Sequence, residues 1–292
     1  MRPDRLERFR RAKQAEIAAL EQAAAQGGLP APLPGARRDL RAARRRPATG
    51  APAAVIAEYK RASPSRGTIA TGITPEDAAA QYAAAGASCL SVLTEETYFR
   101  GRLEFLSRMT APGLPLLRKD FLFHSLQIVM TAATPASALL LIVRLTPDVR
   151  VLRDLREQAE AHGLHAVVEV FDAADLTLAR DSGARIIQVN ARNLETLAVD
   201  CGVCLRLAEQ HRATQGGADE CWIAASGMDS AEHLRDAADA GYDAVLVGTA
   251  LMAGGQPGAA LRRLLGNGNA FSGVRSPGGV RGDIPAGIGA AP

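Results

Sequence analysis

Short apolar runs recur along most of the chain, separated by longer segments of mixed polarity. Runs such as Leu139–Val143 are apolar at every position, which is typical of strands buried on both faces of a sheet. On this basis we predict eight strands: Val55–Glu58, Cys89–Leu93, Leu114–Arg118, Ala138–Val143, His165–Val170, Arg185–Val189, Cys221–Ala224 and Asp243–Val247.

Helical segments lie between these strands. They include Pro75–Ala85, Leu103–Met109, Pro147–His162, Ala173–Asp181, Val203–His211 and Ser230–Ala240. Eight strands alternating with about eight helices imply parallel pairing through right-handed crossovers. A doubly wound open sheet shows the same alternation, but its G-x-G-x-x-G fingerprint does not follow the first strand. Eight units also suit a closed sheet, so we expect an α/β fold, a (β/α)8 TIM barrel with an extra N-terminal helix.

The two ends of the chain depart from this rhythm. Residues 4–25 have the 3.6-residue apolar period of an amphipathic helix, and a Gly/Pro-rich break follows. For the arginine run Arg37–Arg46 we favour a solvated connecting face over a polyanion-binding patch. The tail is rich in Gly, Pro, Ala and Ser and is predicted to be disordered. The expected organisation is an N-terminal helix and Arg-rich leader (1–50), a barrel catalytic domain (51–266) and a disordered tail (267–292).

The charge balance narrows the class of ligand. The net charge of +3 over 292 residues is small, and aromatic residues make up only 4%. These values argue against nucleic acid, which calls for a basic stripe or stacking platforms, and favour a small anionic molecule. No apolar run reaches the ~18–20 residues of a membrane span, and the charged N-terminus does not resemble a secretory signal. We therefore expect a cytoplasmic protein.

Four cysteines are too few and too irregular for a disulfide framework. Cys201 and Cys204 have the spacing of half a zinc site, but no second pair follows at ligand spacing. We expect reduced thiols and no bound metal.

Ionisable residues gather at the predicted strand ends, where barrels place their catalytic groups. Glu58 and Lys60 are two residues apart at the first strand and so share one side of it. Lys119 follows the third strand, and Glu169 ends the fifth. Burying such charges is costly unless they are paired. Four of them at one mouth indicate acid–base chemistry more than structural ion pairing.

Other polar residues follow the remaining strands. The second strand leads to Phe99, and the sixth ends in Asn190 and Arg192. Small residues follow the last two strands, Ser226-Gly227 and Gly248-Thr249, and let backbone N–H groups approach an anion. A short helix beginning near Thr249 would add its positive end, so we predict a phosphate site there.

In combination, these segments closely resemble indole-3-glycerol-phosphate synthase, over roughly residues 50–265. The resemblance rests on seven motifs in the same order: Ile56–Ser65, Ser91–Glu95 with Tyr98–Gly101, Leu117–Phe121, Val168–Val170, Asn190–Leu194, Ser226-Gly227 and Leu246–Gly248.

The resemblance implies a lyase of tryptophan biosynthesis that decarboxylates and dehydrates 1-(2-carboxyphenylamino)-1-deoxyribulose 5-phosphate without a cofactor. It implies Lys119 as general acid, Glu169 as proton carrier in the dehydration, Lys60 as anion anchor and Glu58 as the group that orients the lysines. Asn190 and Arg192 would bind the hydroxyls and anionic groups, and Phe99 the aryl ring. It also suggests transfer of the product to a tryptophan synthase-type partner. The implied phosphate-binding residues are Ser63, Ser226, Gly227, Gly248 and Thr249.

Some residues depart from the family pattern. Ala225 replaces a glutamate after the seventh strand, Gln188 replaces a glycine, and Pro135 should shorten the helix after Lys119. A divergent paralogue with an altered substrate, or a catalytically silent ligand-binding relative, is therefore the alternative. A phosphoribosylanthranilate isomerase would need a Cys/Asp acid–base pair, but Cys89 lies inside the second strand.

Overall fold

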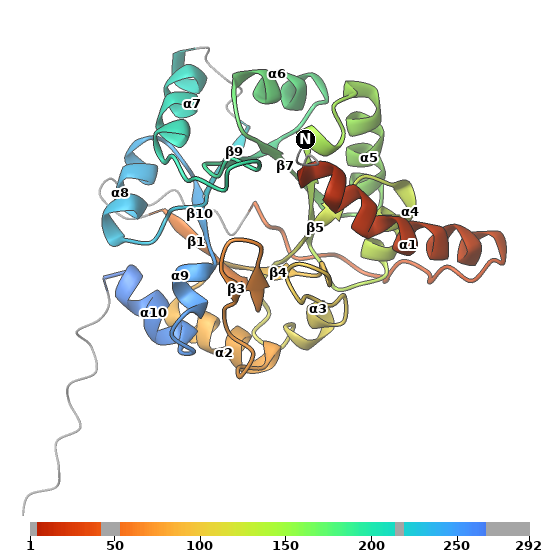
Figure 1. Cartoon of the computed structure of the whole chain (residues 1–292), viewed down its shortest axis with the longest axis horizontal. Coiled ribbons are helices and arrows are strands. Elements are labelled where there is room, and N and C mark those ends of the chain that lie inside the picture. Colours follow the sequence, from red (N-terminus) through yellow and green to blue (C-terminus); the bar gives the residue numbers. More distant parts are fainter. Residues whose placement is uncertain (1–4, 42–52, 214–218, 267–292) are drawn as a thin grey trace, which may run out of the picture.

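Eight parallel strands close into a barrel in the computed structural model, which describes residues 5–41, 53–213 and 219–266 (Figure 1). Each barrel strand pairs with the next one along the chain, and the last pairs with the first. The eight strands and the TIM-barrel fold predicted from the sequence are confirmed. The barrel strands are β1 (Ala54–Tyr59), β4 (Cys89–Leu93), β5 (Leu116–Leu122), β6 (Ala138–Ile142), β7 (His165–Val170), β8 (Ile186–Asn190), β9 (Cys221–Ala225) and β10 (Ala244–Val247).

Helices surround the barrel (Figure 1). Capping side chains fix the starts of several helices. Thr74 accepts a hydrogen bond from the Asp77 amide at the start of α2. Asp148 caps α5, which therefore begins at Val149, two residues later than predicted. None of the helices in the described ranges is long and apolar enough to span a membrane. The helices are α1 (Arg5–Ala25), α2 (Pro75–Ala85), α3 (Phe105–Arg108), α4 (Ser125–Ala132), α5 (Val149–Ala161), α6 (Ala173–Asp181), α7 (Gly202–Ala213), α8 (Ala231–Asp239), α9 (Thr249–Met252), α10 (Pro257–Leu264) and the 3-10 turn η1 (Val143–Leu145).

Side chains alternate between two cores along each strand. One set fills the barrel, with Leu117, Leu140 and Leu246 among its members. The other set, which includes Leu90 and Leu139, packs between the strands and the helices. This alternation sends Glu58, Lys119 and Glu169 to the inside, because each lies an even number of residues from an interior apolar position on its own strand.

Two features of the strands differ from the prediction. The loop after β1 contains a short hairpin, β2 (Ala62–Ser63) and β3 (Gly67–Thr68), which the pattern did not reveal. Strand β5 does not end at Arg118 but continues to Leu122, with a register shift against β6. Lys119 therefore lies within a strand rather than in a loop, and its backbone is held by the sheet.

Helix α1 packs across the carboxyl end of β5. Its Phe9 ring stacks on Phe121 at 4.0 Å between centroids, and Arg10 donates to the Leu145 carbonyl of η1. Lys13 forms a buried ion pair of 2.6 Å with Asp120. The helix is thus part of the barrel mouth and not a separate appendage.

The segment after α1 runs back to the opposite end of the barrel. Leu40 is buried there and packs on Ile56 and Cys89, at the amino ends of the strands. Arg37 is half-buried and donates to the carbonyls of Ala132, Thr134, Ala136 and His162. The prediction of a solvated face is therefore wrong for Arg37, which satisfies carbonyls at the ends of α4 and α5 and in the loop after α4. Residues 42–46 of the arginine run and the tail from 267 onward lie outside the described residues.

Candidate active site

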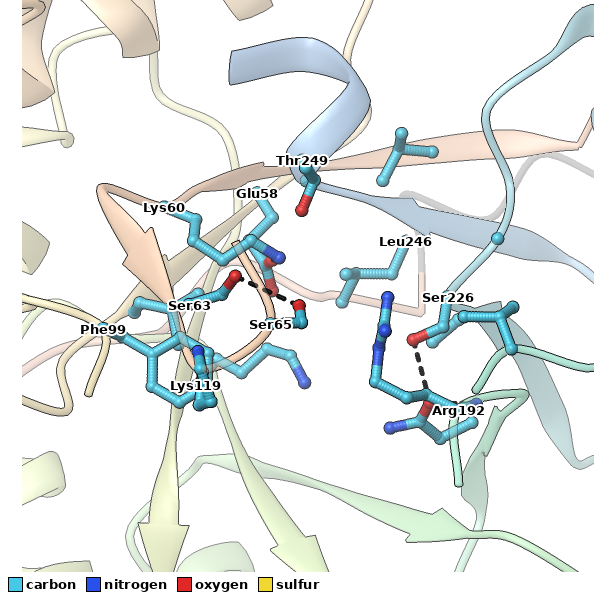
Figure 2. Close-up of a pocket in the computed structure, with 18 of the residues that line it drawn as sticks. Glu58, Lys60, Ser63, Ser65, Phe99, Lys119, Arg192, Ser226, Leu246 and Thr249 are labelled. Carbon is cyan, nitrogen blue, oxygen red and sulfur yellow. Dashed lines mark hydrogen bonds and ion pairs between the residues drawn. The ribbon is translucent and has the colours of Figure 1, made fainter. Parts of the chain in front are cut away.

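A cavity of about 610 Å³ opens at the carboxyl ends of the strands (Figure 2). All twelve residues singled out from the sequence line it, although they come from seven of the eight barrel strands or the loops that follow them. They are Glu58, Lys60, Ser63, Phe99, Lys119, Glu169, Asn190, Arg192, Ser226, Gly227, Gly248 and Thr249.

Two lysine–carboxylate pairs lie at the bottom of the cavity. Lys60 Nζ is 2.6 Å from Glu58 Oε1, and Lys119 Nζ is 3.6 Å from Glu169 Oε2. The lysine side chains are 15% and 18% exposed, whereas both carboxylates are only 2% exposed. The carboxylates are therefore shielded and the ammonium groups face the cavity. Of these two pairs, the second is the looser and leaves its lysine freer to reach a ligand.

Gly248 makes room for the first pair. A Cβ at this position would overlap Glu58 Oε1 and stand 3.0 Å from Lys60 Nζ. The backbone of Gly248 has φ −124°, so the need for glycine here comes from space and not from conformation. Helix α9 begins directly afterwards at Thr249, as predicted, with Thr249 on the cavity wall.

The turn after β9, the neighbour of β10 in the barrel, forms the next part of the cavity wall. Ser226 and Gly227 both have positive φ, 70° and 76°, so two successive residues adopt the left-handed region. Ser226 Oγ donates to Asn190 Oδ1 at 2.9 Å, and the Arg192 amide donates to the same oxygen at 2.9 Å. Asn190 thus ties the turn after β9 to the loop after β8; Figure 2 shows Ser226 and Arg192 on this part of the cavity wall.

Cationic groups gather on this side of the cavity. Burial lowers the pKa of Arg192, and the nearby Arg66 guanidinium lowers it further. Arg66 belongs to the turn of the unpredicted β2–β3 hairpin and also lines the cavity. Two like charges facing one cavity create a favourable place for an anion. Sequence reasoning missed Arg66, because only the hairpin brings it to the mouth.

An apolar wall completes the cavity. Phe99 and Phe121 lie with ring centroids 6.1 Å apart, and Phe9 of α1 adds a third ring. Glu95 shapes the loop that carries Phe99: its buried carboxylate accepts hydrogen bonds from the amides of Thr97, Tyr98 and Phe99. Phe9 and Phe121 were missed, although Phe121 follows Lys119 by two residues and so shares its side of β5.

A family comparison agrees with this geometry. The family model described as indole-3-glycerol phosphate synthase matches residues 6–264. The chain belongs to the indole-3-glycerol phosphate synthase family. The match includes α1 and the whole barrel.

Several relatives of the same description cover most of this chain. The protein of Koribacter versatilis is 42% identical over 214 residues, which are 73% of this chain and 80% of the relative. That of Desulfosudis oleivorans is 40% identical and covers 72% and 78%, and that of Parafrankia sp. is 44% identical and covers 70% and 74%. Family membership makes this chain a decarboxylating lyase of tryptophan biosynthesis that acts on a phosphorylated small molecule, and the divergent or silent alternative is not favoured.

A solved structure supports the fold alone. Thiamine phosphate pyrophosphorylase from Pyrococcus furiosus superposes with a TM-score of 0.52 at 13% identity, over 75% of this chain and 97% of that one.

Two of the departures from the indole-3-glycerol phosphate synthase pattern, Ala225 and Gln188, lie inside the barrel. Ala225 is 2% exposed and lines the cavity beside Asn190 in the β8–β9 register, so the wall carries a methyl group where a carboxylate was expected. Gln188 is fully buried, and its amide nitrogen donates to Glu169 Oε2. Helix α4 ends at Ala132, before Pro135, in agreement with the prediction that this helix is shortened. Sequence reasoning did not find the contact of Gln188 with Glu169.

The cysteines lie apart from the ionisable groups of the cavity floor. Burial raises the pKa of Cys204 to about 12, and its thiol approaches the Val189 carbonyl. Cys201 is half-buried beside Gly227. The described part of the chain contains no group of three or more His, Cys, Asp or Glu arranged to hold a metal ion.

Proposed function

We propose that Lys119 is the general acid of indole ring closure and that Glu169 moves protons in the dehydration that follows. The observation that carries this proposal is the Lys119–Glu169 pair: its 3.6 Å separation, its buried carboxylate and its half-buried ammonium at the cavity floor. A positioned acid and base of this kind are what two successive proton transfers require.

The order of bond changes in the reaction suggests when each residue would act. The aryl carbon that bears the carboxylate attacks the ribulose carbonyl carbon, and Lys119 donates a proton to the carbonyl oxygen as it becomes a hydroxyl. The carboxylate then leaves as carbon dioxide, and its bonding electrons restore the ring. Loss of that hydroxyl as water, with a proton delivered to it and another removed from the ring system, gives indole-3-glycerol phosphate. The contact of Glu169 with Lys119 supports the assignment of these last proton transfers to Glu169.

Lys60 is proposed to hold the substrate carboxylate or another anionic group, and Glu58 to fix the direction of the Lys60 ammonium. Their 2.6 Å contact supports this assignment, because a lysine side chain is otherwise long and mobile. Holding the reacting groups in place can supply a large part of a rate enhancement.

The other residues that line the cavity are proposed to bind the rest of the substrate. Phe99 would pack against the aryl ring, and Asn190 and Arg192 would bind hydroxyls and anionic groups. The phosphate would lie among small residues whose backbone can approach closely. The proposed phosphate-binding residues are Ser63, Ser226, Gly227, Gly248 and Thr249.

Lysine is rare in this chain. Only three of the 34 basic residues are lysines, Lys13, Lys60 and Lys119, and the rest are arginines. An arginine cannot release a proton near neutral pH, so a lysine is needed where a proton is donated. The presence of a lysine at position 119 supports its assignment as this donor.

The test compares Lys119→Met, Lys119→Arg and the wild type by indole fluorescence and by release of carbon dioxide. Both variants are expected to lose at least about 100-fold in kcat, because neither residue can act as an acid. Lys119→Arg keeps the charge and is the matched control for electrostatics. Activity of Lys119→Arg within a few-fold of wild type would remove Lys119 from the role of acid. Location in the cytoplasm and product transfer to a tryptophan synthase-type partner remain part of the proposal, and a pull-down with such a partner would test the latter.

A further inference from the structure

Gln188 and Glu169 are register partners on neighbouring strands. Glu169 of β7 pairs with Gln188 of β8, and both side chains point into the barrel. Gln188 Nε2 donates a hydrogen bond to Glu169 Oε2. The same carboxylate oxygen lies 3.6 Å from Lys119 Nζ, which is beyond a direct hydrogen bond. The amide of Gln188 is therefore the closer donor to this oxygen.

The carbonyl oxygen of the Gln188 amide indicates that this residue does more than fill space in the barrel. Gln188 Oε1 is buried and has no hydrogen-bond partner among the described residues. An unpaired buried carbonyl is unfavourable, and a side chain kept only to fill the barrel would be better as leucine or methionine. The amide is thus retained at a cost, and the contact that it provides is the one with Glu169.

We propose that Gln188 is a positioning residue for Glu169: its amide donates to Oε2 and holds the carboxylate in place beside Lys119. The catalytic part of this inference rests on the proton-carrying role proposed above for Glu169. The charged groups around the carboxylate are Lys119 of β5 and, across the same cavity, Glu58 and Lys60 of β1 and Arg192 after β8.

The test replaces Gln188 by Met, which has similar length but no donor, and by Glu, which adds a second carboxylate. Because the chain contains three lysines, protein labelled with ¹³C-lysine gives few signals, and the Lys119 signal reports on the protonation of its neighbour Glu169. The inflection due to Glu169 is identified by its absence in Glu169→Gln. Gln127→Leu is the matched control, since Gln127 is also fully buried but bonds to Glu16 and backbone groups instead of Glu169.

In Gln188→Met the inflection should move to higher pH by about one unit, because the ionised carboxylate loses a donor. In Gln188→Glu it should move further. The acidic limb of the pH profile of kcat should shift in the same direction. We expect kcat to fall about tenfold and KM to change less than kcat. Gln127→Leu should lower Tm and leave the inflection in place.

An unchanged inflection in both folded Gln188 variants would overturn the inference. A shifted inflection in variants whose kcat profile stays at the wild-type position would uphold the hydrogen bond and overturn the catalytic role of Glu169. The two failures are thus distinguishable. If Gln188→Glu does not fold, Gln188→Met alone decides between these outcomes.

Discussion

Lys13 of helix α1 and Asp120 of strand β5 form an ion pair of 2.6 Å with side chains only 5% and 1% exposed. Asp120 also accepts hydrogen bonds from Thr94 at 2.5 Å and from Arg118 at 3.2 Å. Asp120 is adjacent in sequence to Lys119. The docking of the N-terminal helix and the placement of the proposed acid therefore depend on the same short stretch of β5.

Asp120→Asn should destabilise the protein strongly at neutral pH. Burial acts to raise the pKa of Asp120, but the charges of Arg118 and Lys13 outweigh it, so the folded-state pKa is lowered. A group with a lowered pKa stabilises the fold above its unfolded-state pKa, and this contribution is lost as the pH falls through the folded-state value. We expect a loss of about 3–5 kcal/mol in the free energy of unfolding at pH 7, since one partner of a buried pair is removed.

Urea unfolding between pH 3 and pH 8 would measure this effect. The difference between Asp120→Asn and wild type should shrink below about pH 4, where an unfolded aspartate takes up its proton. Asp154→Asn, at an exposed position of α5, is the control and should change stability little. A pH-independent difference would contradict the ion-pair interpretation.

Gly248→Ala should lower activity through the Glu58–Lys60 pair. The added methyl group would overlap Glu58 Oε1 and crowd Lys60 Nζ, so the pair must move. A displacement on the order of 1 Å can cost about 100-fold in kcat/KM. Gly254→Ala is the matched control: a Cβ there meets nothing within 4 Å, and that variant should keep wild-type kinetics. Equal kinetics of the two variants would show that the pair does not need its present position.

Glu95→Gln should loosen the loop that presents Phe99. Replacement of one carboxylate oxygen by an NH2 group places a donor next to a backbone N–H that the carboxylate now accepts from. We expect a loss of about 1–3 kcal/mol in the free energy of unfolding. KM should rise more than kcat falls, because the aryl-binding wall is affected and the proposed acid is not. Steady-state kinetics of Glu95→Gln beside Glu96→Gln, the exposed neighbour, would measure the difference.

Lys60→Arg should be milder than Lys119→Arg. If Lys60 only holds an anionic group, a guanidinium can take over part of that contact, and KM should rise by about tenfold with a smaller change in kcat. Lys60→Met removes the charge and should raise KM further. A complete loss of kcat in Lys60→Arg would instead indicate that Lys60 transfers a proton.

The features predictable from sequence were those that depend on local pattern. Buried strands appear in the sequence as apolar runs. The two-residue spacing of Glu58 and Lys60 predicted that their side chains share one side of the strand, and the 2.6 Å contact between them bears this out. The extension of β5 beyond Arg118 was not predicted, because Lys119 and Asp120 interrupt the apolar run that marks a strand.

What the sequence did not reveal depends on contacts between distant segments. Phe9 reaches the cavity only because Lys13 docks α1 on β5, and Arg66 only because a hairpin forms in the first loop. The contact of Gln188 with Glu169 requires the register of β7 against β8. Periodicity within one segment carries no information on these relationships.

The leader that follows α1 has a consequence for the order of folding. Arg37 donates to the carbonyl of His162, 125 residues further along the chain, and Arg41 to that of Asp219, 178 residues further. A ribosome releases the leader first, long before the segments that accept these hydrogen bonds have been made. Arg37 and Arg41 must therefore wait for these two partners until most of the barrel has been synthesised. The leader is made early and is among the last segments to complete its contacts.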